Sequence, residues 1–473
     1  MYRISSFASH AAWMLGTAMV LASNGTSSAA QSIRPLAYSR SVLPNGLVLL
    51  MNEDRSTPLV AVDVVYHVGA KDEQPGHTGL AHLCEHLMGQ GSPNEPLPAT
   101  VFIQSIGGTS PHWAQTSEDV TDYYATVPSN QLETMLWLES DRMAAPLTRA
   151  DAAHLSPARE VIRQERLQMR EGPVFGLANS ITLPWVTDAP YHIDPLGPMT
   201  DLNIATAQDA KKFCTPYYVP NNAIVSLSGD FSSARAKALV TKYFGGIPRR
   251  PVPRRPIVST AHGSTLHRAV LEDARARTPM LQRDWPGASF ANPERSALVA
   301  LASILTRDRV GRLTKALVYD RALATRVIAF NADLEKAGVF QIDVYPRPAA
   351  SLTAIEQVMD SVIADVKVHG VTAAEIEPFK RANAVEAVAT LQSRLARADT
   401  LANGEGFAHD PVAYARQVNR AFALTPNDIV RVARSYLGPF GVVMSLIPAG
   451  KLDLISKPDL PYTNVTPIAA VAP

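Results

Sequence analysis

The chain has little cysteine, no excess of either charge and, beyond its first 30 residues, no long hydrophobic run. Its 473 residues include two cysteines, Cys84 and Cys214, so at most one disulfide can form and the fold must rest on its hydrophobic core. The 44 basic and 43 acidic residues give a formal net charge of +1, which favours neither a nucleic-acid partner nor a membrane surface. No later apolar stretch is long enough to form a stable membrane span.

The N-terminal region differs in kind from the rest. Arg3 gives a positive start, residues 11–22 are apolar but too short to span a bilayer, and residues 26–32 are mostly small. This pattern is typical of a secretory signal peptide, here residues 1–30 with cleavage after Ala30. A short membrane anchor is the alternative, and it fits the length and flanks less well. The sequence therefore predicts a periplasmic or secreted protein.

The length and the 46% hydrophobic content predict two or more domains. Proline and arginine crowd together in residues 249–265, which prevents a continuous helix and favours an exposed, extended linker. We therefore expect an N-terminal domain at residues 35–248, the linker at 249–265, a C-terminal domain at 266–450 and a tail at 451–473.

Both halves mix β-type and helical patterns without strict alternation. In the first half we expect strands at residues 46–52, 59–69, 119–128 and 222–231, with helices from Thr78 and over 129–147, the latter capped by Ser129. In the second half we expect strands at 278–287, 325–334, 338–346 and 441–449, with helices from Pro293 and over 352–401. This order favours an α+β fold over a doubly wound α/β fold. Residues 215–230 and 433–450 also share a tyrosine, a proline turn and a β-run, which indicates a diverged duplication.

Residues 79–91, "GLAHLCEHLMGQG", hold two histidines and a glutamate within five positions. His82 and His86 are four residues apart, so on a helix they lie on one face and supply two zinc ligands. Glu85 lies on the neighbouring turn, where it suits a general base better than a third ligand. Cys84 points away from both histidines, and we expect a small buried thiol there in preference to a ligand or a disulfide. The alternative to a metal site is an amphipathic surface helix that carries two histidines.

A third ligand is expected from residues 156–171, "SPAREVIRQERLQMRE", where Ser156 and Pro157 resemble an N-cap and a first helical residue. Helical spacing places Glu165 on the apolar face of this segment. That face also carries Ala158, Val161, Ile162 and Met169. A carboxylate there needs a partner such as a metal ion, so Glu165 is the candidate. The alternative is a half-exposed carboxylate paired with an arginine.

At these residues the sequence resembles the insulinase and pitrilysin family of inverzincin metallopeptidases, which includes mitochondrial processing peptidase. The resemblance covers most of the chain after the N-terminal region. Its motifs, in the family's order, are "LPNGLVLLMNE", "GAKDEQPGHTGLAHLCEH", "SIGG", "EDVTDYYATVP", "LESDRM", "REVIRQE", "KKFCTPYYVPNNAIVSLSGD" and "LTPNDIVRVARSYL". The zinc motif is the specific one, and the others support it.

The resemblance implies that His82, His86 and Glu165 bind one Zn²⁺ and that Glu85 is the base that activates water. It implies two homologous α+β domains, each a mixed or antiparallel sheet with helices packed on one face. Two such chains would close like a clamshell on an unfolded peptide, which adds as a strand to a sheet edge. The expected activity is that of a zinc endopeptidase acting on short or unfolded peptides.

Three departures from the family pattern qualify this expectation. Ala158 stands where active members carry a glutamate seven residues before the third ligand, and Trp113 stands where they usually carry asparagine. Val318 and Thr325 stand where active members carry an arginine and a tyrosine that stabilise the oxyanion. We therefore expect a second homologous subunit, in a heterodimer, to supply that pair.

Other interpretations stay open. Four residues near the missing pair could substitute for it or could be ordinary surface residues: Arg312, Tyr319, Arg321 and Arg326. The chain could also be a non-catalytic core or scaffold subunit, since the family contains such members. A metal-storage protein is less well supported, because the sequence has no other histidine or cysteine cluster.

Overall fold

The structure is a computed structural model, and it describes residues 32–109, 113–259 and 264–466. The predicted signal peptide lies outside these residues. Among the helices of the described ranges, none has the length and apolar character needed to cross a membrane.

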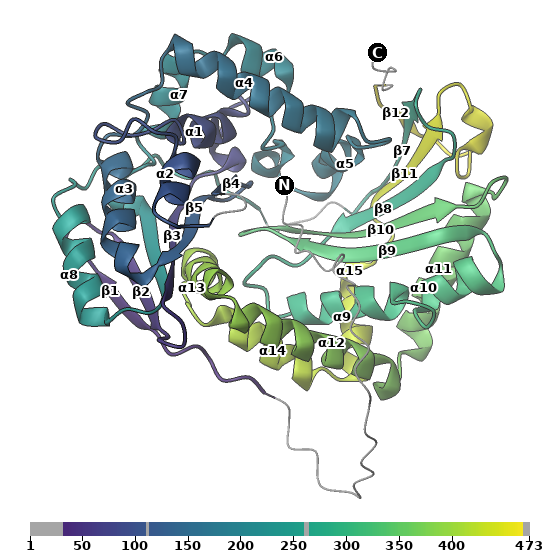
Figure 1. The fold of residues 1–473 in the computed structure, drawn as a ribbon. Helices are drawn as coiled ribbons and strands as arrows, with labels where there is room; N and C mark the ends of the chain where they lie inside the picture. The colour runs from purple at the N-terminus through teal and green to yellow at the C-terminus, as the bar shows by residue number, and fades with distance from the viewer. Residues whose placement is uncertain (1–31, 110–112, 260–263, 467–473) are drawn as a thin grey trace, which may run out of the picture.

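The first half is built on a six-stranded sheet with the order β1-β2-β6-β3-β5-β4 (Figure 1). Its strands are β1 (Ser39–Val42), β2 (Val48–Glu53), β3 (Leu59–Tyr66), β4 (Ala114–Thr116), β5 (Thr121–Pro128) and β6 (Ala223–Gly229). Strands β2 and β6 run parallel, whereas the other neighbours are antiparallel. β3 is β-branched and buried along almost its whole length, because both faces of the sheet are covered at its centre.

The second half repeats this topology. Its sheet has the order β12-β7-β11-β8-β10-β9, in which β7 and β11 run parallel. Its strands are β7 (Leu266–Asp273), β8 (Met280–Pro286), β9 (Ala324–Asp333), β10 (Gly338–Pro346), β11 (Gly441–Pro448) and β12 (Thr463–Asn464). The order β2-β6-β3-β5-β4 of the first sheet therefore corresponds to β7-β11-β8-β10-β9 of the second. The repeated sequence segment includes β6 and β11, which occupy equivalent positions in the two sheets. The expected α+β fold with two homologous domains is confirmed.

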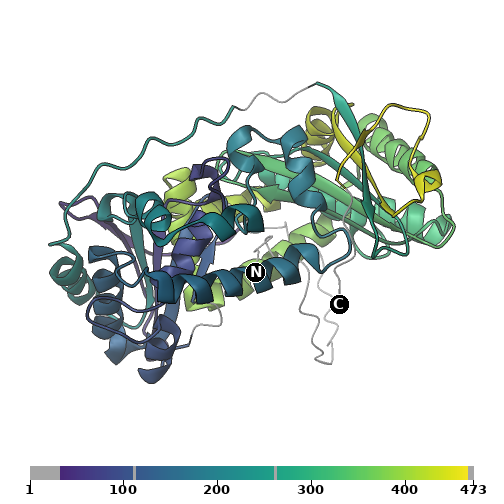
Figure 2. The ribbon, with the colours of Figure 1, turned by 90° about the horizontal axis from the view of Figure 1, so that it is seen from above.

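Helices surround both sheets (Figures 1 and 2). Those of the first half are α1 (Leu80–Met88), α2 (Ala99–Ser105), α3 (Leu132–Ala144), α4 (Ala152–Arg166), α5 (Ala178–Val186), α6 (Met199–Ile204), α7 (Ala207–Cys214) and α8 (Ser233–Phe244). Those of the second half are α9 (Arg295–Thr306), α10 (Arg312–Thr314), α11 (Leu352–His369), α12 (Ala373–Gln392), α13 (Arg394–Ala408), α14 (Ala413–Ala423) and α15 (Pro426–Tyr436).

The two halves exchange helices. α13 of the second half packs on β6, β3 and β2 of the first sheet, where Leu401 and Ala402 join a buried apolar cluster with Leu50, Val65 and Ile224. α5 of the first half packs in turn on β11 and β8 of the second sheet. Each sheet therefore has its own helices on one face and a helix from the other half on the opposite face. Between the halves, the described part of the proline-rich segment runs as an extended strap without regular structure (Figure 2).

Two helix starts differ from the prediction. α4 begins at Ala152, and Asp151 is its N-cap, accepting hydrogen bonds from the amides of Ala153 and His154. Pro157 thus lies inside the helix, where it removes one backbone hydrogen bond, because Asp151 caps the earlier turn and buried Leu155 packs into the core. Ser129 does not cap α3, since its hydroxyl donates to Asp230.

The expectation of unpaired cysteines is wrong. Cys84 and Cys214 form a disulfide, with their Cα atoms 6.5 Å apart and a sequence separation of 130. Cys84 faces α7, which packs directly on α1 and brings Cys214 to the same place. The sequence contained no local signal for this pairing, because the contact exists only when α1 and α7 are docked.

Candidate metal centre

The helix α1 that carries the histidines is fixed at its N-terminus. Gly79, its N-cap residue, has φ +83°, and a Cβ there would lie 2.9 Å from Leu202 Cδ2, so only glycine fits without strain. The buried carboxylate of Glu73 accepts hydrogen bonds from the amides of Gly79 and Ala81, each at 2.7 Å. Burial raises the pKa of Glu73 to about 8, although these two hydrogen bonds oppose the shift. Glu73 therefore supplies the cap that α1 lacks at Gly79 itself.

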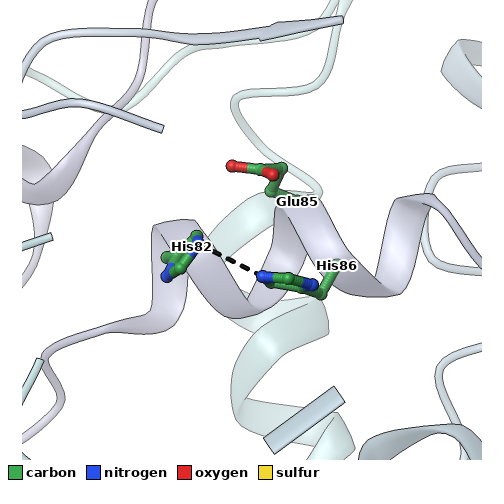
Figure 3. A group of neighbouring side chains, drawn as sticks. All are labelled: His82, Glu85 and His86. Carbon is green, nitrogen blue, oxygen red and sulfur yellow. Dashed lines mark hydrogen bonds between the residues drawn. The ribbon is translucent and has the colours of Figure 1, made fainter. Parts of the chain in front are cut away.

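Three side chains converge above α1. The Nε2 atoms of His82 and His86 lie 3.1 Å apart, and Glu165 Oε2 of α4 lies 3.3 Å from the first and 3.4 Å from the second (Figure 3 shows the histidines). A tetrahedral zinc ion with ligand distances of about 2.0–2.1 Å requires ligand atoms about 3.3–3.4 Å from one another. The spacing of these three atoms matches such a site without rearrangement.

The polar atoms of the site also fit a cation. Glu165 Oε2 is enclosed and has no hydrogen-bond partner among the described residues, although it lies within 3.4 Å of the Nε2 atom of each histidine, so a cation between them would satisfy it. Burial lowers the pKa of His82 to about 3, with the neighbouring His86 adding to the shift, which keeps the imidazole neutral as a ligand must be. Burial disfavours the charged form of Glu165, but contact with the two histidines outweighs it and lowers the pKa of this carboxyl group.

Glu85 lies on the next turn, with its carboxylate directed beside the histidine pair (Figure 3). It offers an oxygen within 4.8 Å of a nitrogen of each histidine, and its side chain is buried. The hydroxyl of Thr116 donates to Glu85 Oε2 at 2.6 Å and leaves the other oxygen available. Burial raises the pKa of Glu85, while the charge of His86 and the Thr116 hydrogen bond oppose the shift. The arrangement suits a group that takes up and releases a proton.

A cavity between the two halves lies beside β4, the strand that contacts α1. Thr116 ends β4, the edge strand of the first sheet, and among the described residues β4 pairs with β5 alone. Gln115 and Thr116 line a cavity of about 560 Å³, which is also lined by Phe290, Phe330 and Phe407 of the second half. In the part of the chain that the structure describes, a strand edge without a partner therefore lies next to the helix that carries both histidines, and it borders a cavity of a size that binds ligands.

Comparisons with known proteins identify the family. The family described as "Insulinase (Peptidase family M16)" matches residues 48–182, and "Peptidase M16 inactive domain" matches residues 205–383. The chain belongs to the insulinase family, peptidase family M16.

The relatives of this chain in family M16 include named zinc proteases. The zinc protease PqqE of Helicobacter pylori is 27% identical over 429 residues, which cover 89% of this chain and 94% of that protein. The crystal structure of a protease from Helicobacter pylori superposes with a TM-score of 0.79 at 25% identity, over 88% of this chain and 100% of that one. The periplasmic protease PqqL from Escherichia coli superposes with a TM-score of 0.70 at 17% identity, over 88% of this chain but 48% of that one. In fold, this chain therefore corresponds to about half of PqqL.

The structure shows where the three departures from the pattern of active M16 members lie. Ala158 is buried in α4, and His82 Nδ1 has no hydrogen-bond partner in the described part of the chain. Trp113 lies against Tyr123, with ring centroids 5.0 Å apart, and beneath the guanidinium of Arg142 at 4.7 Å. A Cβ added to Gly89, just after α1, would lie 2.6 Å from the Trp113 ring. Trp113 is therefore packed under the end of the histidine helix.

The positions of the missing pair lie in the second half. Val318 packs against the second core, and Thr325 is exposed on the edge strand β9, where its hydroxyl donates to the backbone of Tyr345. The four residues that could substitute for the missing arginine and tyrosine are near Val318 and Thr325 in sequence, in the second half. Arg312 is held by Glu375 and Asp365, and Arg326 stacks over Tyr345.

The sequence analysis did not identify two residues that support the site. Glu73 caps α1 and Thr116 orients Glu85, yet neither is part of the His-x-x-Glu-His pattern. Glu73 lies within the motif "GAKDEQPGHTGLAHLCEH", and Thr116 lies just before "EDVTDYYATVP". Their contacts with α1 depend on the packing of η1 (Ala70–Asp72) and β4 against this helix.

Proposed function

We propose that the chain is a zinc-dependent endopeptidase that hydrolyses short or unfolded peptides. His82, His86 and Glu165 hold one Zn²⁺, and Glu85 is the general base. The observation that carries this proposal is the spacing of the three ligand atoms, 3.1 to 3.4 Å, which matches the edges of a zinc tetrahedron. The names of the relatives support the same metal.

The roles of the residues follow from their places. Zinc bound here would polarise both a water molecule and the carbonyl group of the peptide. Glu85 would take up a proton from the attacking water and return it to the leaving amine, because its carboxyl group lies beside the histidine pair. Thr116 holds one carboxylate oxygen and so directs the other.

The substrate is recognised mainly through its backbone. A peptide that adds as a strand to the free edge of β4 would pass Thr116 and hence Glu85. Main-chain hydrogen bonds require an extended segment, so a folded protein would have to expose one first. The cleft beside β4 leaves space for such a segment.

A second homologous subunit is part of the proposal. It would supply the arginine and tyrosine that Val318 and Thr325 replace, and it would form a heterodimer with this chain. The correspondence of this chain to about half of PqqL supports an arrangement in which two such units act together. The proposed location is the periplasm or the cell exterior, after removal of residues 1–30, in line with the disulfide.

The test compares the mature wild-type chain with Glu85→Gln, alone and with the product of a neighbouring gene of the same family. We expect one zinc per chain in both proteins and peptide hydrolysis only in the wild type with its partner. His154→Ala is the matched control, because the side chain of this half-buried histidine hydrogen-bonds Asp151 at the start of α4 and should change neither quantity. Undiminished turnover by Glu85→Gln would exclude its role as base, and full activity of the chain alone would exclude the need for a partner.

A non-catalytic core or scaffold subunit is the second candidate. The match of residues 205–383 to the "Peptidase M16 inactive domain" description and the replaced arginine and tyrosine favour it. A scaffold does not need a metal, so a protein that purifies without zinc and does not bind added zinc would support this candidate over the first.

A further inference from the structure

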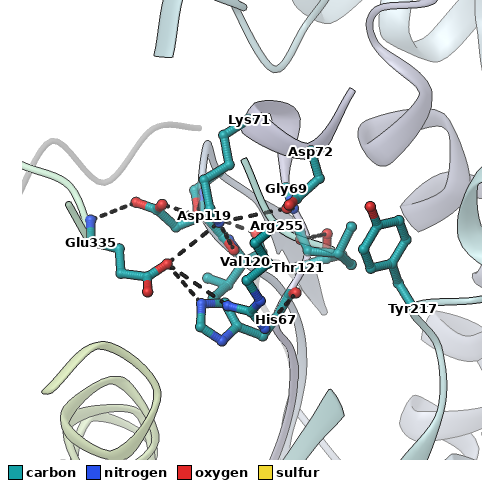
Figure 4. A network of polar contacts seen from close by, with 12 residues as sticks. His67, Gly69, Lys71, Asp72, Asp119, Val120, Thr121, Tyr217, Arg255 and Glu335 are labelled. Atoms are coloured by element: carbon teal, nitrogen blue, oxygen red, sulfur yellow. Dashed lines mark hydrogen bonds and ion pairs between the residues drawn. The ribbon is translucent and has the colours of Figure 1, made fainter. Parts of the chain in front are cut away.

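A buried polar cluster joins the two halves close to the metal site. Its members are His67, Lys71, Asp119 and Tyr191 of the first half and Glu335 of the second, and we refer to them as the interdomain cluster (Figure 4 shows four of the five). Glu335 lies in the turn between β9 and β10. Lys71, Asp119 and Glu335 are only 4%, 3% and 6% exposed, so their charges are enclosed by protein.

Glu335 contacts the first half through both its backbone and its side chain. Its amide donates to Asp119 Oδ2 at 2.8 Å, and its Oε2 lies 2.8 Å from His67 Nε2 and 3.5 Å from Lys71 Nζ. The next amide, that of Lys336, donates to the hydroxyl of Tyr191, which itself donates to Asp119 Oδ1. The turn is therefore fixed at two successive residues.

The charges of the cluster depend on one another. Lys71 Nζ lies 3.2 Å from Asp119 Oδ1 and 3.5 Å from Glu335 Oε2. Burial works against the charged form of Glu335, but His67 and Lys71 outweigh it and lower the pKa of this carboxyl group. Lys71 Nζ also lies 3.5 Å from the buried Asp72 Oδ2, so removing the Glu335 carboxylate would leave Lys71 with two carboxylates and would change the charge balance of the set, which costs more in a buried cluster than in an exposed ion pair.

One path leads from the cluster to Glu85. Asp119 belongs to a tight turn in which the hydroxyl of Ser117 accepts hydrogen bonds from the amides of Asp119 and Val120. Thr116 immediately precedes this turn and donates to Glu85 at 2.6 Å. A displacement of Asp119 would therefore move the residue that orients the proposed base.

A second path leads to the start of α1. Lys71 lies in η1, whose amides at Ala70 and Lys71 donate to the carbonyl groups of Ser117 and Glu118. Two residues further on, Glu73 caps α1 by accepting from Gly79 and Ala81. The interdomain cluster is thus linked both to α1, which carries Glu85, and to β4, which carries Thr116.

We propose that Glu335 is a positioning residue for the metal site, acting through Lys71 and Asp119 on α1 and on Thr116. It connects the placement of the second half to the orientation of Glu85, which it does not touch. The proposal rests on the proposed peptidase function, because a misplacement of about 1 Å at a catalytic group is enough to lower turnover strongly.

The test uses the mature chain in the assembled form that shows turnover, with Glu335→Gln as the main variant. Glu335→Asp keeps the charge and serves as the conservative variant. Asp320→Asn, which removes the exposed ion pair with Lys315 in the same half, is the matched control. The measurements are zinc content, kcat and KM, and amide hydrogen exchange over residues 70–83 and 114–120.

For Glu335→Gln we expect unchanged zinc content, KM within about twofold of the wild type, kcat lower by on the order of tenfold, and faster exchange in both segments. Glu335→Asp should recover part of kcat, and Asp320→Asn should match the wild type. Unchanged kcat with only a lower unfolding temperature would overturn the proposal, as would unchanged exchange in both segments. If Glu335→Gln does not fold, the same comparison with Glu335→Asp decides.

The two proposals fail in distinguishable ways. A wild-type protein without zinc or turnover would refute the proposed function, and hydrogen exchange would still show whether Glu335 controls the two segments. A fully active Glu335→Gln protein would refute only the positioning role.

Discussion

Removing the Cys84–Cys214 disulfide should destabilise the protein strongly. The perturbation is the double variant Cys84→Ala/Cys214→Ala, which deletes the bond between α1 and α7. Both side chains are fully buried in the core of the first half, so alanine leaves only small cavities in place of the two sulfur atoms.

The magnitude follows from the length of the closed loop. The cysteines are 130 residues apart, and chain entropy for a loop of this length amounts to about 5 kcal/mol at 25 °C. Structure that remains in the unfolded chain reduces the measured value, so we expect a loss of roughly 3–5 kcal/mol.

The assay is urea unfolding followed by tryptophan fluorescence, with metal-free protein so that bound zinc does not add to stability. Wild-type protein unfolded in the presence of a reductant is the matched control, because it has the same atoms without the bond. The reduced wild type and the double variant should lose similar amounts, and any difference between them measures the packing of the two sulfur atoms.

Two results would refute this reasoning. A loss below about 1 kcal/mol in the double variant would mean that the bond does not restrict the unfolded chain. Reaction of two thiols in the native, oxidised protein with a thiol reagent would mean that the disulfide does not form.

Two further predictions concern carboxyl groups. Glu165→Gln should weaken zinc binding by more than about a hundredfold, measured with a chelating competitor, whereas Glu160→Gln on the same helix should not, because Glu160 is exposed and pairs with Arg163. Burial raises the pKa of Asp343 to about 7, above the 3.8 of a free aspartate, so this carboxyl group destabilises the folded state increasingly as the pH rises from about 4 to 7. Asp343→Asn should therefore stabilise the protein against urea by roughly 2–4 kcal/mol at pH 8 and by almost nothing at pH 4, and an equal gain at both pH values would contradict this.

Much of the fold was predictable because its signals are local. The β-branched runs at β3 and β6 and the repeated segment at β6 and β11 identified the strands and the duplication. The start of α4 was predicted five residues too late, because Ser156 and Pro157 form a plausible cap and only the packing of Leu155 shows that the helix already exists before them. The exchange of α5 and α13 between the halves was not predicted, since the amphipathic pattern of a helix does not specify which sheet it covers.

In the candidate site, too, some features follow from the local sequence and others depend on tertiary packing. The sequence by itself determined the pairing of His82 with His86 and the neighbouring position of Glu85, because four residues make about one helical turn. Only the tertiary structure decided that Glu165 reaches both histidines, that Thr116 orients Glu85, that Cys84 pairs with a cysteine 130 residues away, and that Glu335 contacts Asp119 across 216 residues. These contacts depend on how helices and sheets dock, and the free energy of docking comes from the whole core instead of from the residues that meet.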